Sequence, residues 1–315
     1  MLNWGVIGLG NVAKRFCDSL SHSDVGHLYA IASHSKEKQN AFAKAYAPDH
    51  VYGDYDAFFN DEEIDVVYIA VPHGLHYELC KKALEHYKCV LCEKPAFLTK
   101  KEAEEITQMA KDRHLFFMEA MKTRFIPLIK VLRKNIADGM IGDIVSIENH
   151  FLSEVPYDPE RYLFDHKMGG ALYDTGVYGL AFLFDFVRTP VVNIENKVEH
   201  QYGVDVYDQV TLTFENGVKG IVECAMNRPR DRRGIIKGTK GSVMLDPYYR
   251  PEEAIVEIGD ESYTLTAKIP YDDFHPEIEA VHQDIEHLQV EDQLMSFSDT
   301  IYLSEMFEKI KDVSK

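Results

Sequence analysis

The chain has 315 residues, of which 45% are hydrophobic, and this composition is ordinary for a globular protein of one large or two medium domains. Its formal net charge of −18 argues against binding to nucleic acid or to an anionic membrane. Five irregularly spaced cysteines argue against a disulfide framework. We find no signal peptide and no apolar run long enough to span a bilayer, so we expect a cytoplasmic protein.

The first predicted strand, residues 3–7, runs into a glycine-rich turn, and a helix is predicted from Ala13 to His22. In the fingerprint G-x-G-x-x-[GA], the first glycine makes the tight turn and the second lets the backbone approach a pyrophosphate. The third small residue allows the helix to pack closely. This strand, turn and helix predict a dinucleotide site at Gly8, Gly10, Asn11, Val12 and Ala13.

A second strand is predicted at residues 27–32, followed by Ser33, His34, Ser35 and Lys36. In NAD-preferring folds an acidic residue near this point binds the ribose 2′-hydroxyl, and none is present here. Ser33, His34 and Lys36 instead suit a 2′-phosphate, so we predict NADP(H) as the preferred cofactor, with NAD(H) as the alternative. The competing interpretation is that Lys36 merely opens a solvated helix.

The apolar strand at residues 66–71 ends at Pro72 and is followed by His73 and His76. The H-x-x-H spacing suggests a metal site, but no nearby carboxylate or cysteine completes a ligand set. We therefore predict that Pro72, His73 and His76 line the cofactor site, and we predict no metal.

The next apolar strand ends abruptly at Glu93-Lys94-Pro95. Open α/β sheets carry their chemistry at the carboxyl ends of strands, and a proline restricts the preceding backbone to extended or turn conformations. Lys94 is therefore a candidate catalytic residue, the alternative being a solvated lysine at the start of a loop. A helix capped by Thr99 and a strand at 115–118 complete the alternation of strands and helices that predicts a doubly wound parallel sheet over residues 1–120.

From residue 121 the pattern changes to long strands joined by hairpin turns such as Asn216-Gly217, with helices at 126–138 and 170–186. We expect residues 121–315 to form an α/β domain with a large open, mainly antiparallel sheet. Two amphipathic helices, 277–290 and 299–311, end the chain, with the option that they pack back on the N-terminal domain. The first of them has an apolar stripe at Ile278, Val281, Ile285 and Leu288.

Four segments together resemble the Gfo/Idh/MocA oxidoreductases: Gly8 to Ala13, Glu93 to Pro95, Glu119 to Phe125, and Gly169 to Tyr178. The resemblance covers essentially the whole chain. It implies a Rossmann domain, a second domain whose open sheet often forms the oligomer interface, and NAD(P)-dependent oxidation or reduction of sugars, polyols or related alcohols. On this basis we expect a small-molecule substrate and a homodimer or homotetramer assembled through the C-terminal sheet.

Tyr178 stands where many members of the family have a histidine, four residues after an aspartate. This is similar to the branch that contains dihydrodiol dehydrogenase and glucose–fructose oxidoreductase, in which a lysine and a tyrosine are implicated at the active site. The branch commonly prefers NADP(H). The chain departs from the family pattern at Met168, where the first of three glycines is usual, and at His34, where an arginine often meets the phosphate.

The proposed chemistry is hydride transfer coupled to proton transfer at the substrate oxygen. Asp174 and Tyr178 are spaced i, i+4 on the predicted helix and therefore share a face. A free tyrosine has a pKa near 10, too high for a base at neutral pH unless a cation such as Lys94 stabilises the phenolate. We assign Tyr178 as the proton donor or acceptor and Lys94 as the residue that lowers its pKa and holds the substrate oxygen, with the exchanged roles as the alternative. Asp174 is assigned as the group that orients the lysine or a substrate hydroxyl. The alternative for Tyr178 is a half-buried core aromatic.

Glu93 and Arg124 complete the predicted cofactor residues, and Arg161 joins Lys94, Asp174 and Tyr178 as a predicted substrate residue. Each arginine could equally form a surface ion pair, and the basic run 228–233 is interpreted as a solvated loop. Two other functions stay open: a non-catalytic NAD(P)-binding sensor or regulatory protein, and a reductase of a non-carbohydrate carbonyl. A sensor needs neither Lys94 nor Tyr178, which argues against it.

Overall fold

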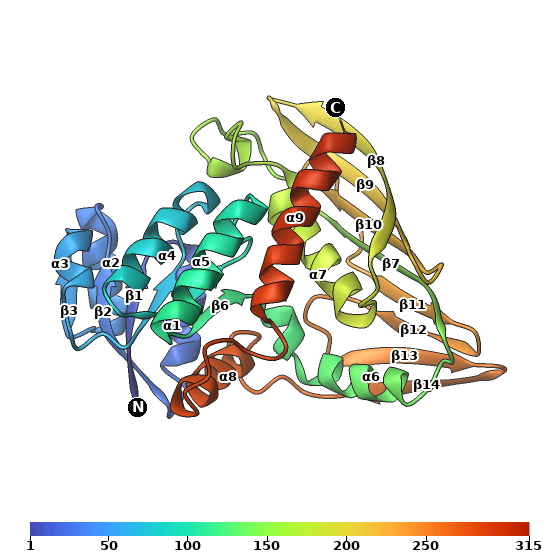
Figure 1. Cartoon of the computed structure of the whole chain (residues 1–315), viewed down its shortest axis with the longest axis horizontal. Coiled ribbons are helices and arrows are strands. Elements are labelled where there is room, and N and C mark those ends of the chain that lie inside the picture. Colours follow the sequence, from blue (N-terminus) through green and yellow to red (C-terminus); the bar gives the residue numbers. More distant parts are fainter. Residues whose placement is uncertain (315) are drawn as a thin grey trace. The chain divides into compact units, whose positions relative to one another are not determined.

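The structure is a computed structural model that describes residues 1–314 and divides into two compact units (Figure 1). The first unit contains residues 1–122 and 270–304. The second contains residues 123–269 and the chain from Glu305 onward. The last helix, α9 (Phe297–Val313), is therefore shared between the two units.

A parallel six-stranded sheet forms the centre of the first unit, in the order β3-β2-β1-β4-β5-β6. This is the Rossmann order, and it confirms the predicted doubly wound sheet. Its strands are β1 (Leu2–Ile7), β2 (Gly26–Ala32), β3 (His50–Tyr52), β4 (Val66–Ile69), β5 (Cys89–Glu93) and β6 (Phe117–Ala120). Its helices are α1 (Asn11–Leu20), α2 (Lys36–Tyr46), α3 (Tyr55–Phe59), η1 (His73–Leu75), α4 (His76–Glu85), α5 (Lys100–Arg113) and α8 (His275–Glu286).

Apolar side chains cover both faces of this sheet, as a parallel sheet requires. One face packs against α3, α4 and α5 through a continuous buried cluster. On the other face, Phe16 of α1 stacks on Tyr68 of β4 with ring centroids 3.8 Å apart, and it also meets Phe274 at the start of α8. Thus α8, far along the chain, completes the first unit beside α1.

Two elements predicted in this unit end at other residues than the sequence indicated. The strand predicted at 115–118 is β6 (Phe117–Ala120), because the Leu115 amide still donates to Ala110 at the end of α5. The apolar stripe predicted through Leu288 is wrong at its end. Helix α8 stops at Glu286, and Leu288 is 88% exposed with a φ of 55°.

The second unit is built on an eight-stranded sheet in the order β14-β13-β12-β11-β7-β10-β9-β8. All neighbouring strands are antiparallel except β7 and β10, which run parallel. The strands are β7 (Ile144–Leu152), β8 (Val191–Gln201), β9 (Val204–Phe214), β10 (Lys219–Ala225), β11 (Gly234–Gly238), β12 (Gly241–Leu245), β13 (Glu253–Ile258) and β14 (Glu261–Thr266). The predicted large and mainly antiparallel sheet is confirmed.

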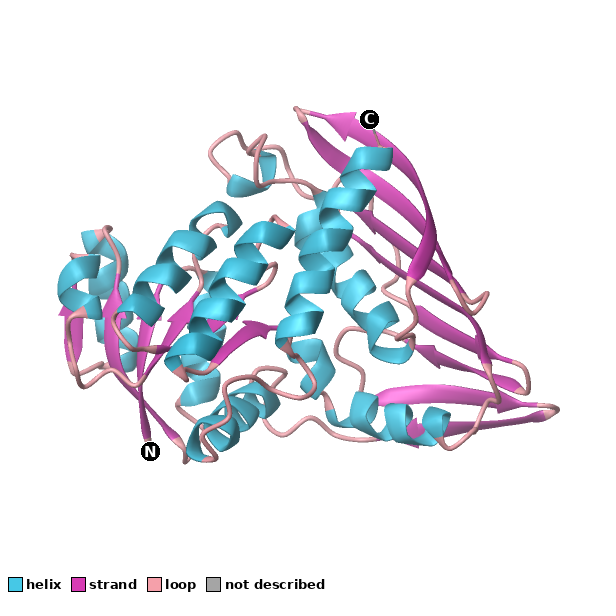
Figure 2. Ribbon diagram, in the orientation of Figure 1, coloured by secondary structure: helices cyan, strands magenta, loops and turns pink. Residues whose placement is uncertain are grey.

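Figure 2 shows α7 (Val177–Phe186) along one face of this sheet, while the other face carries no helix of the described residues. The strands alternate accordingly: in β9, Val210 and Leu212 are buried on the helix side, and Thr211 is partly exposed on the open side. Helix α6 (Pro127–Ala137) and the short turns η2 (Lys122–Phe125) and η3 (Tyr162–Phe164) complete the elements.

The helix predicted at 170–186 is divided into a wide π-helical turn, η4 (Leu172–Gly176), and α7. Glycines bring this segment close to the sheet. A Cβ at Gly179 would lie 2.3 Å from Asn149 Oδ1, and the Asn149 side chain donates to the Gly179 carbonyl across 3.1 Å. Single π-helical turns occur often at functional sites.

Candidate active site

The carboxyl end of β1 is shaped by two glycines with different surroundings. Gly8 has a φ of +92°, and a Cβ there would lie 2.4 Å from the Ala70 carbonyl oxygen after β4. Gly10, in contrast, has no heavy atom within 4 Å of the position of a Cβ. Glycine is needed at position 8 because the turn after β1 lies against the chain that follows β4. At position 10, the glycine leaves open space beside the backbone.

This open space lies at the amino end of α1. Gly10 is the N-cap, no side chain caps the helix, and its first turn holds no acidic residue. Asn11 and Val12 are exposed, whereas Ala13 is fully buried against the unit. Free helix N–H groups with open space beside them suit a pyrophosphate, so these residues fit the phosphates of a dinucleotide.

The turn after β2 contains the residues predicted to bind the 2′-phosphate. Ser35 caps α2 by accepting from the Lys38 amide, and Ser33 is buried with its carbonyl bound by Gln39. His34 and Lys36 are exposed, and His34 packs against Tyr55 with ring centroids 4.2 Å apart. No carboxylate occurs between Ser33 and Lys36, as the sequence indicated.

His76 is enclosed within the first unit. It is fully buried, and its ring nitrogens lie 2.9 Å from the carbonyl oxygens of Val71 and Pro95. Burial lowers the pKa of His76, so the ring is neutral and donates to one of these carbonyls at a time. His76 therefore ties the chain after β4 to the chain after β5, and its assignment to the cofactor site stays a prediction.

The neighbouring His73 is also buried, in η1 directly after Pro72. Within residues 1–314, no group of histidine, cysteine, aspartate and glutamate side chains is arranged to hold a metal ion.

Lys94 follows β5 at the same edge of the sheet and is half-buried. The Glu93 carboxylate accepts from the Tyr68 hydroxyl and from the Lys94 amide, the latter across 3.2 Å. On the other side, Glu119 of β6 accepts from the Ala96 amide across 3.0 Å. Two carboxylates and a buried tyrosine therefore fix the backbone on both sides of Lys94.

In the second unit, the segment 171–185 is buried except at Asp174 and Tyr178, which are both partly exposed. Asp174 lies in the π-helical turn and Tyr178 in the first turn of α7, so the structure brings these two predicted residues together on one side of a buried helix. Lys94 belongs to the first unit and this pair to the second.

Tyr178 is accompanied by residues that the sequence analysis did not select. Its ring lies 5.8 Å from that of Phe151 in β7 and 6.0 Å from that of Tyr249. Arg232 covers the Phe151 ring at 4.3 Å and donates to the Tyr249 hydroxyl across 2.8 Å. The result is an aromatic wall next to Tyr178, with the Arg232 guanidinium over the Phe151 and Tyr249 rings. The interpretation of the basic run 228–233 as a solvated loop is therefore wrong at Arg232, which packs on the Phe151 ring. This contact depends on how the strands align in the sheet, and no local sequence pattern indicates that alignment.

The two remaining arginines lie in different environments. Arg124, in η2, is 1% exposed, and its carbonyl accepts from Arg133, whose guanidinium pairs with Asp185. Arg161 lies on an exposed loop before η3. Their assignments to cofactor and substrate stay predictions.

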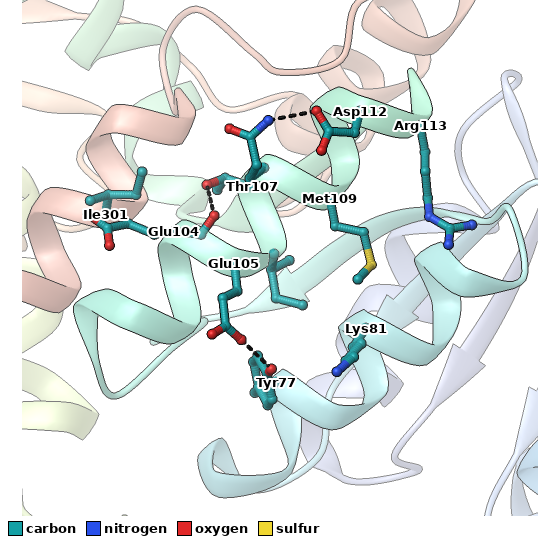
Figure 3. A pocket seen from close by; sticks show the side chains of 11 residues that line it. Tyr77, Lys81, Glu104, Glu105, Thr107, Met109, Asp112, Arg113 and Ile301 are labelled. Atoms are coloured by element: carbon teal, nitrogen blue, oxygen red, sulfur yellow. Dashed lines mark hydrogen bonds between the residues drawn. The ribbon is translucent and has the colours of Figure 1, made fainter.

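A groove of about 800 Å³ between α4 and α5 is separate from these residues (Figure 3). The Tyr77 hydroxyl of α4 donates to the Glu105 carboxylate of α5, and Lys81 and Arg113 are also among the lining residues. It contains none of the predicted cofactor or substrate residues.

The Rossmann order, the glycine turn and the uncapped α1 define the class of the protein: a dinucleotide-binding α/β protein with a second, sheet-based unit. Residues 2–121 match the model of the oxidoreductase family with NAD-binding Rossmann fold, and residues 129–244 match the GFO/IDH/MocA C-terminal domain. The chain belongs to the Gfo/Idh/MocA oxidoreductase family, and the predicted family and NAD(P)-dependent oxidoreductase class are confirmed.

The chain is 30% identical over 270 residues to trans-1,2-dihydrobenzene-1,2-diol dehydrogenase of Bos taurus, an alignment that covers 84% of this chain and 80% of that protein. The Homo sapiens protein of the same name is 29% identical over 271 residues, with the same coverage.

Solved structures share the fold at lower identity. A 3-ketoreductase from Actinomadura kijaniata, in complex with NADP and TDP-benzene, superposes with a TM-score of 0.90 at 23% identity over 99% of this chain and 97% of that one. An aldose-aldose oxidoreductase from Caulobacter crescentus, complexed with glycerol, gives a TM-score of 0.91 at 20% identity with the same coverage. In the described part of the chain, no helix has the length and apolar character needed to cross a membrane.

Proposed function

We propose that this protein is an NADP(H)-preferring dehydrogenase or reductase that interconverts a secondary alcohol and its carbonyl in a sugar, a polyol or a cyclic diol. The observation that carries the proposal is the pair Asp174 and Tyr178, partly exposed on an otherwise buried helix beside an aromatic wall. Flat aromatic rings suit the C–H faces of a cyclic substrate, and Arg232 suits its oxygen atoms. The dihydrodiol dehydrogenase relatives act on a cyclic diol by name.

A nicotinamide bound at the glycine turn would supply the hydride chemistry, and the protein residues would bind the substrate and move one proton. For oxidation, the Tyr178 phenolate takes the hydroxyl proton as the C–H bond breaks and the C=O bond forms. For reduction, the Tyr178 hydroxyl returns that proton to the carbonyl oxygen. The Lys94 ammonium stabilises the phenolate and holds the substrate oxygen, and Asp174 accepts from a neighbouring substrate hydroxyl.

Replacing either proton-handling residue tests the proposal. Tyr178→Phe and Lys94→Ala should each lower kcat about 10²- to 10⁴-fold, because each loses a group that assists proton transfer. The measurement is nicotinamide absorbance during a screen of aldoses, polyols and cyclic diols in both reaction directions. Tyr263→Phe on β14 and Lys101→Ala on α5 are matched exposed controls that should keep wild-type rates.

Retained turnover in Tyr178→Phe or Lys94→Ala would reject the mechanism. Tight cofactor binding with no turnover of any alcohol or carbonyl by the wild type would instead favour the sensor.

The preference for NADP(H) rests on the turn after β2, which offers exposed His34 and Lys36 and no carboxylate. The double variant His34→Ala, Lys36→Ala should bind NADP(H) about tenfold or more weakly, with little change for NAD(H), because hydrogen bonds to a charged phosphate are worth roughly 1.5–3 kcal/mol. Fluorescence titration with both cofactors gives the two affinities, with Lys38→Ala on α2 as the control. A wild type that binds NAD(H) more tightly would refute this preference.

The same proposal includes assembly as a homodimer or homotetramer through the open face of the eight-stranded sheet. The register of the strands aligns a row of partly exposed apolar side chains across that face: Ile221, Ile235, Met244 and Ile255. A row of this kind suits a second copy of the sheet. We also propose a reducing compartment such as the cytoplasm, supported by five cysteines that are all free.

A further inference from the structure

A buried group of charged side chains lies beneath the start of the helix that carries Asp174. Asp205 and Asp208 of β9 are 7% and 2% exposed, and Lys311 of α9 faces them. Together they line a cavity of about 220 Å³, with His166 and His200 among its other lining residues. All of these residues belong to the second unit.

Asp205 binds the helix directly. Its Oδ2 accepts from the Leu172 amide across 2.8 Å, and Leu172 is the first residue of the π-helical turn. Gly170 has a φ of +111°, and a Cβ there would lie 2.2 Å from Asp205 Oδ1, so the carboxylate presses against the backbone. A carboxylate at this place satisfies an amide at the amino end of a helix and complements its dipole.

Asp208 and Lys311 line the same cavity as Asp205, and the Lys311 ammonium lies 3.6 Å from the centre of the Tyr173 ring. Asp208 Oδ1 accepts from the Asn196 side chain across 2.7 Å. Asp205 and Asp208 line the same cavity, so a proton on one of the two carboxyl groups relieves the repulsion between them. Burial and the charge of Asp205 raise the pKa of Asp208 to about 8. Burial lowers the pKa of Lys311, although both aspartates favour its charged form.

We propose that Asp205 is a positioning residue that fixes the segment bearing Asp174 and Tyr178 by accepting from the Leu172 amide, with Asp208 and Lys311 as its charged neighbours in the cavity. The inference rests on the proposed function, since it assigns a task to Asp205 only if Asp174 and Tyr178 act on substrate. Proton transfer is sensitive to displacements of about 1 Å in the reacting groups. The amide that Asp205 binds belongs to Leu172, two residues before Asp174, so a shift there would move Asp174 as well.

The arrangement also predicts a pH dependence of turnover. The other titratable groups that face Asp208 are Lys311 of α9, the buried Cys224 thiol of β10, and the two histidines of the cavity. Above pH about 8, Asp208 loses its proton and two buried carboxylates repel each other, so Asp205 is pushed from its amide. Turnover should therefore fall as pH rises through about 8, and Asp208→Asn, which keeps a neutral donor beside Asp205, should remove that part of the fall.

The decisive experiment combines kinetics with hydrogen exchange measured by mass spectrometry on the full chain. Asp205→Ala should lower kcat about tenfold or more, leave cofactor affinity unchanged, and speed amide exchange in peptides covering 170–178. Asp205→Asn keeps the volume and an acceptor oxygen, so it should recover part of kcat, and it serves if the alanine variant does not fold. Asp260→Asn, in the exposed turn between β13 and β14, is the control and should change nothing.

Exchange is measured without substrate, which separates the two proposals. If Tyr178→Phe abolishes turnover while both Asp205 variants keep wild-type kcat and exchange, the positioning role is overturned and the proposed function stands. If Asp205→Ala speeds exchange in 170–178 while Tyr178→Phe still turns over, the proposed function falls and the hold of Asp205 on the segment stands.

Discussion

At the residue scale, Gly8 and Gly10 lie two positions apart in one turn and meet opposite conditions. Gly8 combines a φ of +92° with a Cβ position only 2.4 Å from a carbonyl oxygen, so no other residue fits without movement of the backbone. Gly10 has a φ of −100°, which any residue adopts, and open space around its Cβ position. The first glycine therefore serves the fold, and we expect the second to serve the ligand.

This difference predicts two separable outcomes. Gly8→Ala should lower the free energy of unfolding by roughly 1–3 kcal/mol through backbone strain. Gly10→Val should unfold near the wild-type temperature and bind the cofactor at least about tenfold more weakly, because its side chain fills the space beside the helix N–H groups. Thermal unfolding without cofactor and fluorescence titration with NADP(H) measure the two effects. A stable Gly8→Ala, or a Gly10→Val with full affinity, would contradict the assignment.

At the scale of elements, the segment after α8 is held by a carboxyl pair. Asp292 accepts from the Met295 amide across 3.0 Å and lies beside Asp284 of α8. Burial and the neighbouring Asp292 raise the pKa of Asp284 to about 7, from 3.8 for a free aspartate. The folded protein therefore holds a proton between pH 4 and pH 7 that the unfolded chain releases.

Since the folded state binds the extra proton, the stability contributed by this pair falls as pH rises from about 4 to about 7 and is constant above that. Asp284→Asn resembles the protonated form and should raise the unfolding temperature relative to wild type by more at pH 8 than at pH 4.5. Differential scanning calorimetry across that range measures the difference, with Asp260→Asn as the exposed control. An equal shift at both pH values would show that the pair does not share a proton.

At the scale of the whole molecule, the open face of the eight-stranded sheet is the proposed interface between copies of the chain. Glu148 interrupts the cross-strand row between Ile221 and Ile235, and the row ends at Ile255, which is 40% exposed. Apolar side chains aligned by strand register lose less entropy on burial than scattered ones, because the sheet already fixes their spacing.

Ile235→Asp should weaken self-association about ten- to a hundredfold, since burying one isoleucine is worth roughly 1.5–3 kcal/mol. Light scattering coupled to size-exclusion chromatography reports the mass at several protein concentrations. Leu288→Asp, which adds the same charge at an exposed site after α8, should leave the mass unchanged. A monomeric wild type would exclude the proposed interface.

Much of the fold was predictable because its signals are local. The Gly8 turn, the Thr99 capping box and the Asn216-Gly217 hairpin each depend on residues within one turn of chain, and the structure has all three. The pairing of Asp174 with Tyr178 was also predictable, since i, i+4 spacing on a helix is a local property. The predictions for Leu288 and for the strand at 115–118 were wrong because the exact residue at which the preceding helix ends was not predictable from the sequence.

The sequence by itself determined the alternation of strands and helices and the glycine turn after the first strand, because these depend on spacing along the chain. It also made Lys94 and Tyr178 the candidates for proton transfer. Only the tertiary structure decided that His76 is enclosed between two carbonyls, that Arg232 covers the Phe151 ring next to Tyr178, and that Asp205 accepts from the Leu172 amide. Those contacts join residues on separate strands and helices, and sheet register, which no local pattern encodes, sets which of them meet.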